Sequence, residues 1–176
     1  IEFHIDILNS LKIKPTIVLG FCSETIIQKI RNYDADIIVN SNYKNGKTSS
    51  IIIGLDAISK VDDILLMSID QPRPKYILEK LIKNHFQSGK EITIPKFILE
   101  DGSLKGGHPV ILSNKILDEM YKFISSEKTM KDFILSKNSI NEVIFEDPLI
   151  KLDLNNKQDY FEGQKLFVKS TENDKE

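Results

Sequence analysis

The sequence predicts an α/β fold in which a mostly parallel sheet is covered by helices on both faces. Short β-rich segments alternate along the chain with longer segments whose apolar residues recur at helical spacing. The short segments are almost continuously apolar, which is typical of strands buried on both faces of a sheet. The 176 residues are 40% hydrophobic and 28% charged, which suits one globular domain with a sizeable core.

The elements of the first half can be placed from local patterns. We expect a helix at residues 1–13, a strand at 14–20, a helix at 23–33, a strand at 36–40, a helix at 47–59, a strand at 63–69 and a helix at 74–89. Ser23 is the expected N-cap of the second helix, and Thr48 or Ser49 that of the third. Pro74 suits the start of the fourth helix and Gly89 its end.

The second half continues the alternation. We expect strands at residues 91–97, 108–113, 141–147 and 149–154, and helices at 114–125, 129–137 and 156–168. Thr129 and Asp132 have the spacing of a capping box, which supports the helix at 129–137. Residues 168–176 are expected to form a flexible tail, so the predicted domain covers residues 1–167.

Charge and composition exclude several functions. The net charge is −2 and the basic residues are spread along the chain, which argues against a nucleic-acid partner. No apolar run approaches the ~20 residues that span a membrane, and no signal peptide is visible. Cys22 is the only cysteine, so no internal disulfide can form. A cytoplasmic protein is the simplest interpretation.

The stretch DDILLMSIDQPRP, residues 62–74, contains an isolated acid after a strand-like run. Pro72 and Pro74 prevent the chain beyond Asp70 from continuing as a strand. Ligands bind beyond the carboxyl ends of the strands in parallel sheets, so Asp70 would face a functional crevice. Alternatively, Asp70 caps the turn before the next helix, and the pattern alone does not favour either interpretation.

The segment NGKTSS places Gly46 and three hydroxylated residues, Thr48, Ser49 and Ser50, at the start of a helix. Backbone N–H groups and the helix dipole favour an anion or a polar ligand edge at such a position. An ordinary capped helix after an Asn-Gly turn would produce the same residues, and by itself the segment favours that interpretation.

Two later segments carry further candidates. In LKGGHPV, Gly107 would allow a close approach of backbone to ligand, and His108 could be a polar contact; a plain turn before a strand is the alternative. In KLDLNN, the predicted strand places Asp153 and Asn155 on the same side of its end, because strand side chains alternate. This repeats the arrangement expected at Asp70.

The segments GKTSSIIIGL, LLMSIDQP, GGHPVIL and KLDLNNKQDY, in this order, resemble the signatures of the molybdenum cofactor cytidylyltransferase and guanylyltransferase family. The resemblance covers residues 1 to about 167, and the cytidylyltransferases are the closer match through IDQP and GGHPV. It implies a Rossmann-like three-layer sandwich with a mostly parallel central sheet. It also implies transfer of a nucleoside monophosphate, CMP from CTP, to a phosphorylated acceptor such as the molybdopterin cofactor, with release of pyrophosphate.

The resemblance further implies roles for individual residues. Asp70 resembles the family's catalytic aspartate, which holds Mg²⁺. Asn155 matches the position of a second metal ligand, whereas Asp153 carries the full charge; we favour Asn155 and keep both as candidates. The residues that would contact the nucleotide are Gly46, Thr48, Ser49 and Ser50, and those that would lie against the acceptor are Gly107 and His108.

The chain also departs from the family pattern. Family members open with a Gly-rich loop that grips the triphosphate and has no counterpart here, so we expect about thirty further residues upstream or, less simply, a degenerate relative. The other departures are at Lys47, Thr129, Met130, Lys131, Asn156, Lys157 and Gln158. Two alternatives stay open, a nucleotidyltransferase for another phosphorylated small molecule and a non-catalytic binding relative.

Overall fold

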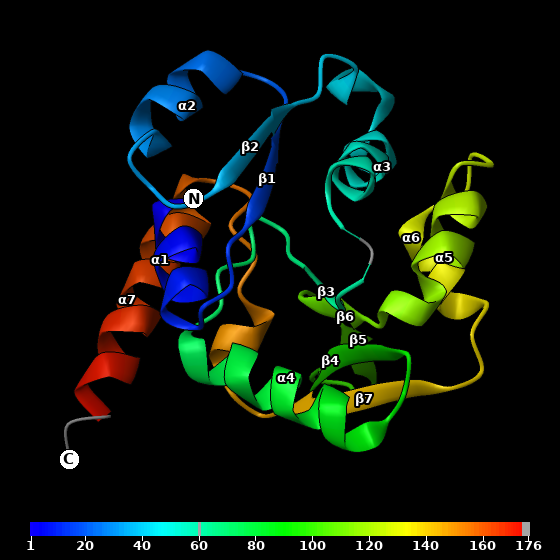
Figure 1. The fold of residues 1–176 in the computed structure, drawn as a ribbon. Coiled ribbons are helices and arrows are strands. Elements are labelled where there is room, and N and C mark those ends of the chain that lie inside the picture. Colours follow the sequence, from blue (N-terminus) through cyan, green and yellow to red (C-terminus); the bar gives the residue numbers. More distant parts are fainter. Residues whose placement is uncertain (60, 174–176) are drawn as a thin grey trace. The chain divides into compact units, whose positions relative to one another are not determined.

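The computed structural model describes residues 1–59 and 61–173 and is shown in Figure 1. The chain divides into two compact units. Unit 1 comprises Ile1–Ile64 and Leu112–Ser139, and unit 2 comprises Leu65–Ile111 and Ile140–Glu176. Each unit therefore combines two separate stretches of the chain.

Unit 1 contains a small parallel sheet and several short helices. Its elements are α1 (Glu2–Ser10), β1 (Thr16–Leu19), α2 (Ser23–Ile30), β2 (Asp36–Val39), the 3-10 helices η1 (Tyr43–Asn45) and η2 (Asn114–Ile116), α3 (Lys47–Ala57), α5 (Leu117–Ile124) and α6 (Met130–Leu135). β1 and β2 pair in parallel, with Thr16 opposite Asp36. α3 packs against β1, and a Cβ at Gly54 would lie only 3.3 Å from Cγ2 of Val18. The glycine therefore permits the close approach of helix and strand.

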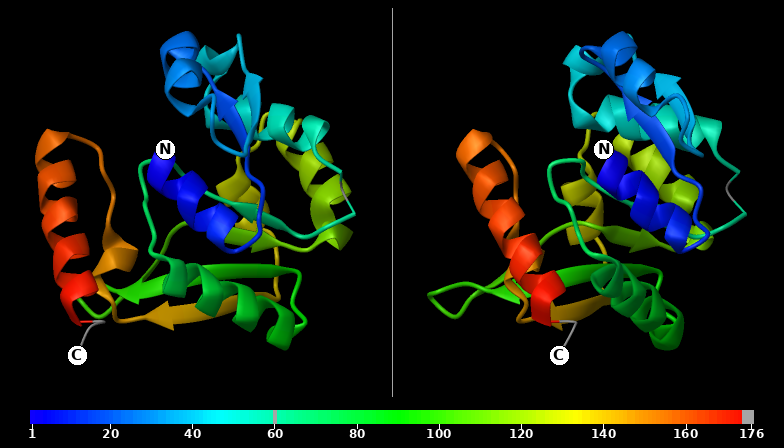
Figure 2. Two further views of the ribbon diagram at one scale, coloured as in Figure 1. Left: turned by 60° about the vertical axis from the view of Figure 1, so that its left-hand side comes forward. Right: turned by 90° about the vertical axis from the view of Figure 1, so that its left-hand side faces the viewer.

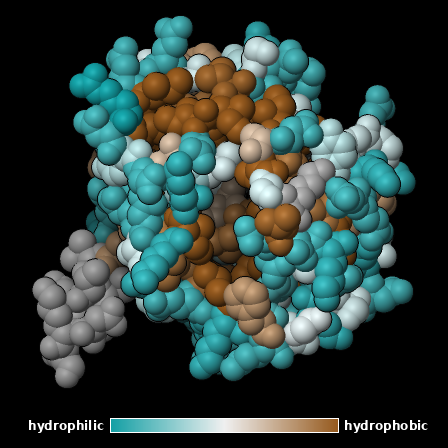
Figure 3. Space-filling model, viewed as in Figure 1, coloured by the Kyte–Doolittle hydropathy of each residue, from teal (hydrophilic) through white to brown (hydrophobic). Residues whose placement is uncertain are grey.

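The small sheet buries its side chains only in part. Figure 3 shows apolar residues gathered on the surface over α2 and β2. Phe21 and Val39 are exposed, and Ile37 and Ile38 are half-buried. These apolar residues form a continuous patch, whereas the apolar residues on most protein surfaces are scattered singly.

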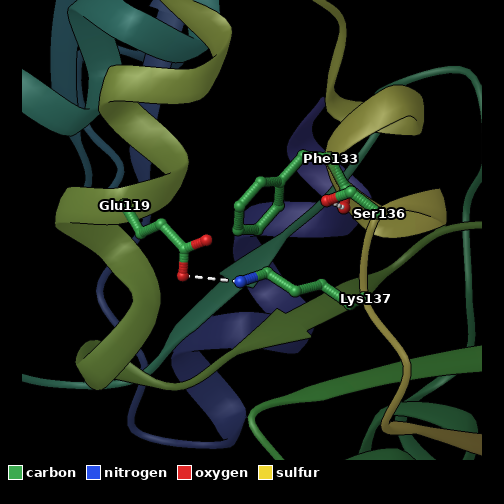
Figure 4. Close-up of polar contacts among 4 residues, drawn as sticks. All are labelled: Glu119, Phe133, Ser136 and Lys137. Atoms are coloured by element: carbon green, nitrogen blue, oxygen red, sulfur yellow. Dashed lines mark hydrogen bonds and ion pairs between the residues drawn. The ribbon is translucent and has the colours of Figure 1, made fainter.

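α5 is joined to α6 by an aromatic contact and to the residues just after α6 by an ion pair, and Figure 4 shows the ion pair. The rings of Phe123 and Phe133 lie 5.5 Å apart, and Nζ of Lys137 lies 4.8 Å from the centre of the Phe133 ring. The same Nζ donates to Oε2 of Glu119 at 2.5 Å. Glu119 is exposed, so the ion pair contributes less than about 1 kcal/mol, and the buried Phe133 contributes more to stability.

The larger sheet has five strands. They are β3 (Ile64–Leu66), β4 (Ile92–Ile98), β5 (Leu104–Gly106), β6 (Val110–Leu112) and β7 (Ile140–Phe145), in the order β3-β6-β4-β5 with β7 also paired to β4. β4 and β7 are parallel, with Ile92 opposite Ile140. β4 and β5 are antiparallel, with Ile98 opposite Leu104. The sheet is therefore mixed.

Unit 2 also contains α4 (Lys75–Ser88), the 3-10 helix η3 (Pro148–Lys151) and α7 (Lys157–Asn173). α4 lies along β4 and β7, as Figures 1 and 2 show. The buried core of this unit consists of Ile77, Leu81, Phe97, Ile111, Val143, Phe145, Leu149, Ile150 and Leu152. Full burial of such a side chain stabilises a fold by roughly 1.5–3 kcal/mol. The core anchors the chain immediately before Asp153, at Leu152.

The predicted α/β fold is confirmed, but the prediction of one mostly parallel central sheet is wrong. The strands fall into two sheets, and the larger one includes the antiparallel β4–β5 pair. This pair arises from a tight turn in which Gly102 has φ +81° and donates its N–H to the carbonyl of Leu99 at 3.0 Å. Asp-Gly at residues 101–102 is a hairpin signal that explains the strand at Leu104–Gly106, where no strand was predicted. The three-layer arrangement stays a prediction.

The predicted strand at residues 149–154 is also wrong. Residues Pro148–Lys151 form η3, with proline in its first turn. The Oδ1 of Asp147 accepts a hydrogen bond from the N–H of Leu149 at 2.8 Å, which caps this turn. Because a proline and a capping aspartate favour a helical start, the apolar residues that follow do not extend into a strand. Residues 152–155 have no regular secondary structure.

The predicted start of α6 and both predicted ends of α4 are confirmed. The N–H of Asp132 donates to Oγ1 of Thr129 at 3.2 Å, and the N–H of Thr129 donates to Oδ2 of Asp132 at 2.9 Å, which is the predicted capping box of α6. α4 begins after Pro74 and ends before Gly89, which has φ +64°.

Other boundaries differ from expectation. The N-caps of α2 and α3 are Cys22 and Gly46, so the predicted caps Ser23 and Thr48 or Ser49 are wrong. α7 continues to Asn173, and residues 174–176 of the predicted tail lie outside the described residues. Within residues 1–59 and 61–173, no helix combines the length and the apolar character needed to cross a membrane.

Candidate functional site

Asp70 is joined to the segment that carries Asp153 through the backbone. Residues 67–69 separate Asp70 from the end of β3, so it lies in the turn before α4 rather than at the strand tip. Its carbonyl accepts a hydrogen bond from the N–H of Leu154 at 2.7 Å. This bond brings the irregular segment at residues 152–155 alongside the turn, although the segment is not the predicted strand.

The carboxylates of this pair of segments contain buried oxygens without a hydrogen-bond partner. Oδ1 of Asp70 and Oδ1 of Asp153 are both buried, and neither accepts a hydrogen bond from any residue that the structure describes. An unpartnered buried polar atom is costly and calls for an explanation, such as a bound ion. Carboxylate oxygens are the ligands that Mg²⁺ and other hard divalent cations prefer, so these two residues fit such a cation.

The arrangement offers a cation two carboxylates rather than a cage of protein ligands. No group of three or more His, Cys, Asp or Glu side chains suited to a metal occurs in the described ranges 1–59 and 61–173. A Mg²⁺ ion usually takes one or two carboxylates and fills its remaining positions with water and substrate phosphate. Two carboxylates therefore match this kind of site better than a structural metal site.

Arg73 is a buried cation beside these carboxylates. It is 2% exposed, and its Nη1 donates to the carbonyls of Leu149 at 3.2 Å and Leu152 at 2.8 Å. Burial lowers the pKa of Arg73 to about 10, while attraction to Asp153 and Asp70 raises it. The guanidinium therefore stays charged at neutral pH. It ties the turn that leads into Asp153 to the turn that carries Asp70.

The loop that contains His108 is attached to the same arginine. Nε of Arg73 donates to the carbonyl of His108 at 3.2 Å. Oε1 of Gln71 accepts from Nη2 of Arg73 at 3.1 Å and from the N–H of His108 at 3.2 Å. Nδ1 of His108 lies 3.3 Å from the carbonyl of Leu66 and can donate to it. The structure thus brings Asp70, Asp153 and the predicted acceptor residues together within unit 2.

Asn155 has a different environment from Asp153. Leu152 and Leu154 pack against Gly163 of α7, where a Cβ would lie 3.2 and 3.1 Å from their methyl carbons. Asn155 is exposed, and its N–H donates to Oδ2 of Asp159 at the start of α7. The buried unpartnered oxygen in this segment belongs to Asp153. The surroundings therefore favour Asp153 over Asn155 as a metal ligand, and both assignments stay predictions.

The predicted nucleotide-binding residues lie in unit 1 and are organised by Asn40. Asn40 is fully buried at the end of β2, and its Nδ2 donates to Oγ of Ser49 and of Ser50, each at 3.0 Å. Oγ of Ser49 donates in turn to the carbonyl of Gly46 at 2.8 Å. Gly46 has φ +91°, a backbone conformation that favours glycine. Thr48 lies half-buried in the same first turn of α3.

Three residues of these sites escaped the sequence analysis, namely Asn40, Gln71 and Arg73. Asn40 ends a predicted strand, which is the same signal that singled out Asp70. Gln71 and Arg73 flank Pro72 in the turn that follows Asp70, and their side chains are joined by a hydrogen bond. The burial of Arg73 carries no local signal, because it depends on the carbonyls of residues 149 and 152.

The fold has counterparts among nucleotidyltransferase structures. It is similar to 2-C-methyl-D-erythritol 4-phosphate cytidylyltransferase from Thermus thermophilus, with a TM-score of 0.75 and 12% identity over 94% of this chain and 86% of that one. A Mycobacterium tuberculosis protein, solved as a complex with manganese, gives a TM-score of 0.72 with 18% identity over 92% and 83%. Molybdopterin-guanine dinucleotide biosynthesis protein A from Archaeoglobus fulgidus gives 0.63 with 17% identity over 96% and 85%. At these identities the likeness concerns the fold.

The chain belongs to the family with the MobA-like NTP transferase domain, whose model matches residues 1–140. The matched range includes Gly46, Asp70 and His108, whereas Asp153 and Asn155 lie beyond it. No curated protein matches the chain. The suspected relationship to the molybdenum cofactor nucleotidyltransferases is thereby confirmed at the level of the family.

Proposed function

We propose that this protein transfers CMP from CTP to a phosphorylated small molecule of the molybdopterin type and releases pyrophosphate. Membership of the NTP transferase family supports the reaction class. The observation that carries the proposal is the pair of buried, unpartnered carboxylate oxygens of Asp70 and Asp153, on segments joined by the Leu154–Asp70 hydrogen bond. The proposed domain extends over residues 1–167.

Asp70 and Asp153 would hold Mg²⁺ in this proposal. When bound, such an ion would neutralise charge on the triphosphate and would help to orient the α-phosphorus for attack. The protein itself contributes two fixed negative charges. Attraction to the buried Arg73 offsets part of the repulsion between them. The solved relative with manganese supports a divalent cation in this fold, and Mg²⁺ is our choice of ion.

Phosphoryl transfer depends mainly on positioning and charge, so few proton transfers are required of the chain. Ser50 and its neighbours Gly46, Thr48 and Ser49 would bind the nucleotide, with the serine hydroxyls oriented by Asn40. Gly107 and His108 would lie against the acceptor, and the backbone of His108 is held by Gln71 and Arg73.

The choice of substrates can be tested directly. The natural full-length protein is incubated with Mg²⁺, CTP or GTP, and either molybdopterin or 2-C-methyl-D-erythritol 4-phosphate, and pyrophosphate release is measured. We expect release with CTP and molybdopterin. Release with the second acceptor alone would support a nucleotidyltransferase for another phosphorylated small molecule. Nucleotide binding without any release would support a non-catalytic relative.

The role of Asp70 is tested in the same assay with Asp70→Asn. The substitution removes one charge while nearly conserving shape, and we expect a rate loss of roughly 100-fold or more. The exposed Asp56 of α3 provides the matched control Asp56→Asn, which should keep the wild-type rate. An Asp70→Asn variant that transfers CMP at the wild-type rate would show that the assignment is wrong.

A further inference from the structure

The side-chain amide of Gln71 is held in one orientation by its oxygen. Oε1 accepts two hydrogen bonds, from Nη2 of Arg73 at 3.1 Å and from the backbone N–H of His108 at 3.2 Å. Both partners can only donate, so the oxygen and not the nitrogen of the amide must face them. The two lone pairs of Oε1 are thereby occupied, and the NH₂ group is directed away from Arg73 and His108.

The NH₂ group of Gln71 remains available for a ligand. Its Nε2 donates to no residue in the part of the chain that the structure describes. Gln71 is only half-buried, so the amide can be reached from solvent. It directly follows Asp70, whose carboxylate contains one of the unpartnered buried oxygens. Two N–H donors of fixed orientation thus belong to the residue that directly follows a proposed cation ligand.

We propose that Nε2 of Gln71 donates to a phosphate oxygen of the substrate, which makes Gln71 a substrate-binding residue of this site. The inference rests on the proposed function, because phosphate oxygens complete the coordination of a cation held by two carboxylates. A phosphate at that cation lies within the reach of neighbouring side chains. A neutral amide can donate to the phosphate without competing with the cation, whereas a carboxylate at the same position would repel the phosphate.

The locked orientation also favours binding. A free glutamine loses rotamer freedom when it binds a ligand, and Gln71 has already lost it through Arg73 and His108. The buried charge of Arg73 also adds a positive potential at Gln71, because its Nη2 donates to Oε1 of Gln71. Arg73 itself donates to backbone carbonyls and to Gln71. Its charge polarises the amide of Gln71, which strengthens the hydrogen bond that the NH₂ group donates to the ligand.

Two variants separate the loss of the hydrogen-bond donor at residue 71 from the introduction of a negative charge there. Gln71→Glu keeps an oxygen for Arg73 and His108 but replaces the NH₂ donor by a charged oxygen. Gln71→Met has a similar shape, adds no charge and removes the donor. The exposed Gln87 of α4 provides the matched control Gln87→Glu. The probe is inorganic pyrophosphate, titrated calorimetrically into the full chain in the presence of Mn²⁺.

We expect both Gln71 variants to weaken pyrophosphate binding by roughly 10- to 100-fold, the range for a hydrogen bond to a charged group. The Mn²⁺ affinity of the uncharged Gln71→Met and the melting temperature of Gln71→Glu should stay close to those of the wild type, and Gln87→Glu should change nothing. Wild-type pyrophosphate affinity in Gln71→Met would overturn the inference, even if Gln71→Glu is impaired, because charge repulsion alone would then explain the result.

The same titrations distinguish a failure of this inference from a failure of the proposed function. Wild-type protein that binds Mn²⁺ and pyrophosphate, with unchanged pyrophosphate affinity in both Gln71 variants, contradicts only the role of Gln71. Wild-type protein that binds neither Mn²⁺ nor pyrophosphate contradicts the two-carboxylate site and the role of Gln71 together.

Discussion

The backbone N–H of Leu154 donates to the carbonyl of Asp70 at 2.7 Å. The two residues are far apart in the sequence, and this bond brings two aspartates onto neighbouring segments of unit 2. Without it, Asp153 would follow η3 as an ordinary loop residue. With it, the buried oxygens of Asp70 and Asp153 lie on paired chain segments that Arg73 also braces.

Arg73 is expected to be the most sensitive polar residue of unit 2. Arg73→Met removes the hydrogen bonds that Arg73 donates to the carbonyls of Leu149, Leu152 and His108, so we expect a loss of about 2–4 kcal/mol in the free energy of unfolding. Urea denaturation measures this loss. The other arginine of the chain, Arg31, is exposed, and Arg31→Met should change stability by less than about 0.5 kcal/mol. Equal effects of the two substitutions would contradict the bracing role.

Asn40 is expected to hold the first turn of α3 against β2. Asn40→Asp keeps the oxygen that accepts from the N–H of Asn42 at 2.9 Å but removes the donor to Ser49 and Ser50. We expect a destabilisation of about 1–3 kcal/mol, because a buried charge is introduced and the amide donor to the two hydroxyls is lost. The exposed Asn45 serves as the control through Asn45→Asp. Unchanged thermal unfolding of Asn40→Asp would show that the contacts do not stabilise the turn.

Asp132 should make stability depend on pH at the acidic end. Hydrogen bonds from Thr129 lower the pKa of Asp132 from its ordinary value of 3.8. A lowered pKa in the folded state means that the contribution is present above 3.8 and is lost as the pH falls through the folded-state value. The stability difference between wild type and Asp132→Asn should therefore be larger at neutral pH than at about pH 2. Urea midpoints at the two pH values measure it, and a difference that grows on acidification would refute the interpretation.

Asp153 and Asn155 can be separated by single substitutions. Asp153→Asn removes the charge of a carboxylate whose Oδ1 is buried and has no hydrogen-bond partner among the described residues. Asn155→Ala alters an exposed side chain. We expect Asp153→Asn to weaken Mn²⁺ binding by roughly tenfold or more and Asn155→Ala to leave it within about twofold. Electron paramagnetic resonance of free Mn²⁺ gives both affinities. The reverse order would restore Asn155 as the second ligand.

Much of the local structure could be predicted from the sequence because its signals are local. The capping box of Thr129 and Asp132 and the boundaries at Pro74 and Gly89 depend on a few neighbouring residues. β5 was missed even though Asp101 and Gly102 carry a turn signal, because its residues are exposed and lack the apolar pattern of a strand. The apolar run at residues 149–154 suggested a strand, but Pro148 and Asp147 impose a 3-10 turn.

The candidate site was predictable in part. Asp70 and Asp153 stood out as acids after apolar runs, and His108 as a histidine beside a glycine pair. The preference for Asn155 came from the resemblance, and the environment of Asp153 became visible only through burial. The fully buried Arg73 and the locked amide of Gln71 depend on contacts between distant segments, which no local pattern encodes.

The central claim is that Asp70 and Asp153 together hold a divalent cation, and a calorimetric titration of Mn²⁺ into wild type and Asp70→Asn tests it most directly. We predict one site in the wild type, and an affinity at least roughly tenfold weaker in Asp70→Asn with an unchanged melting temperature. Asp56→Asn should bind as the wild type does. Equal Mn²⁺ affinity in wild type and Asp70→Asn would contradict the claim.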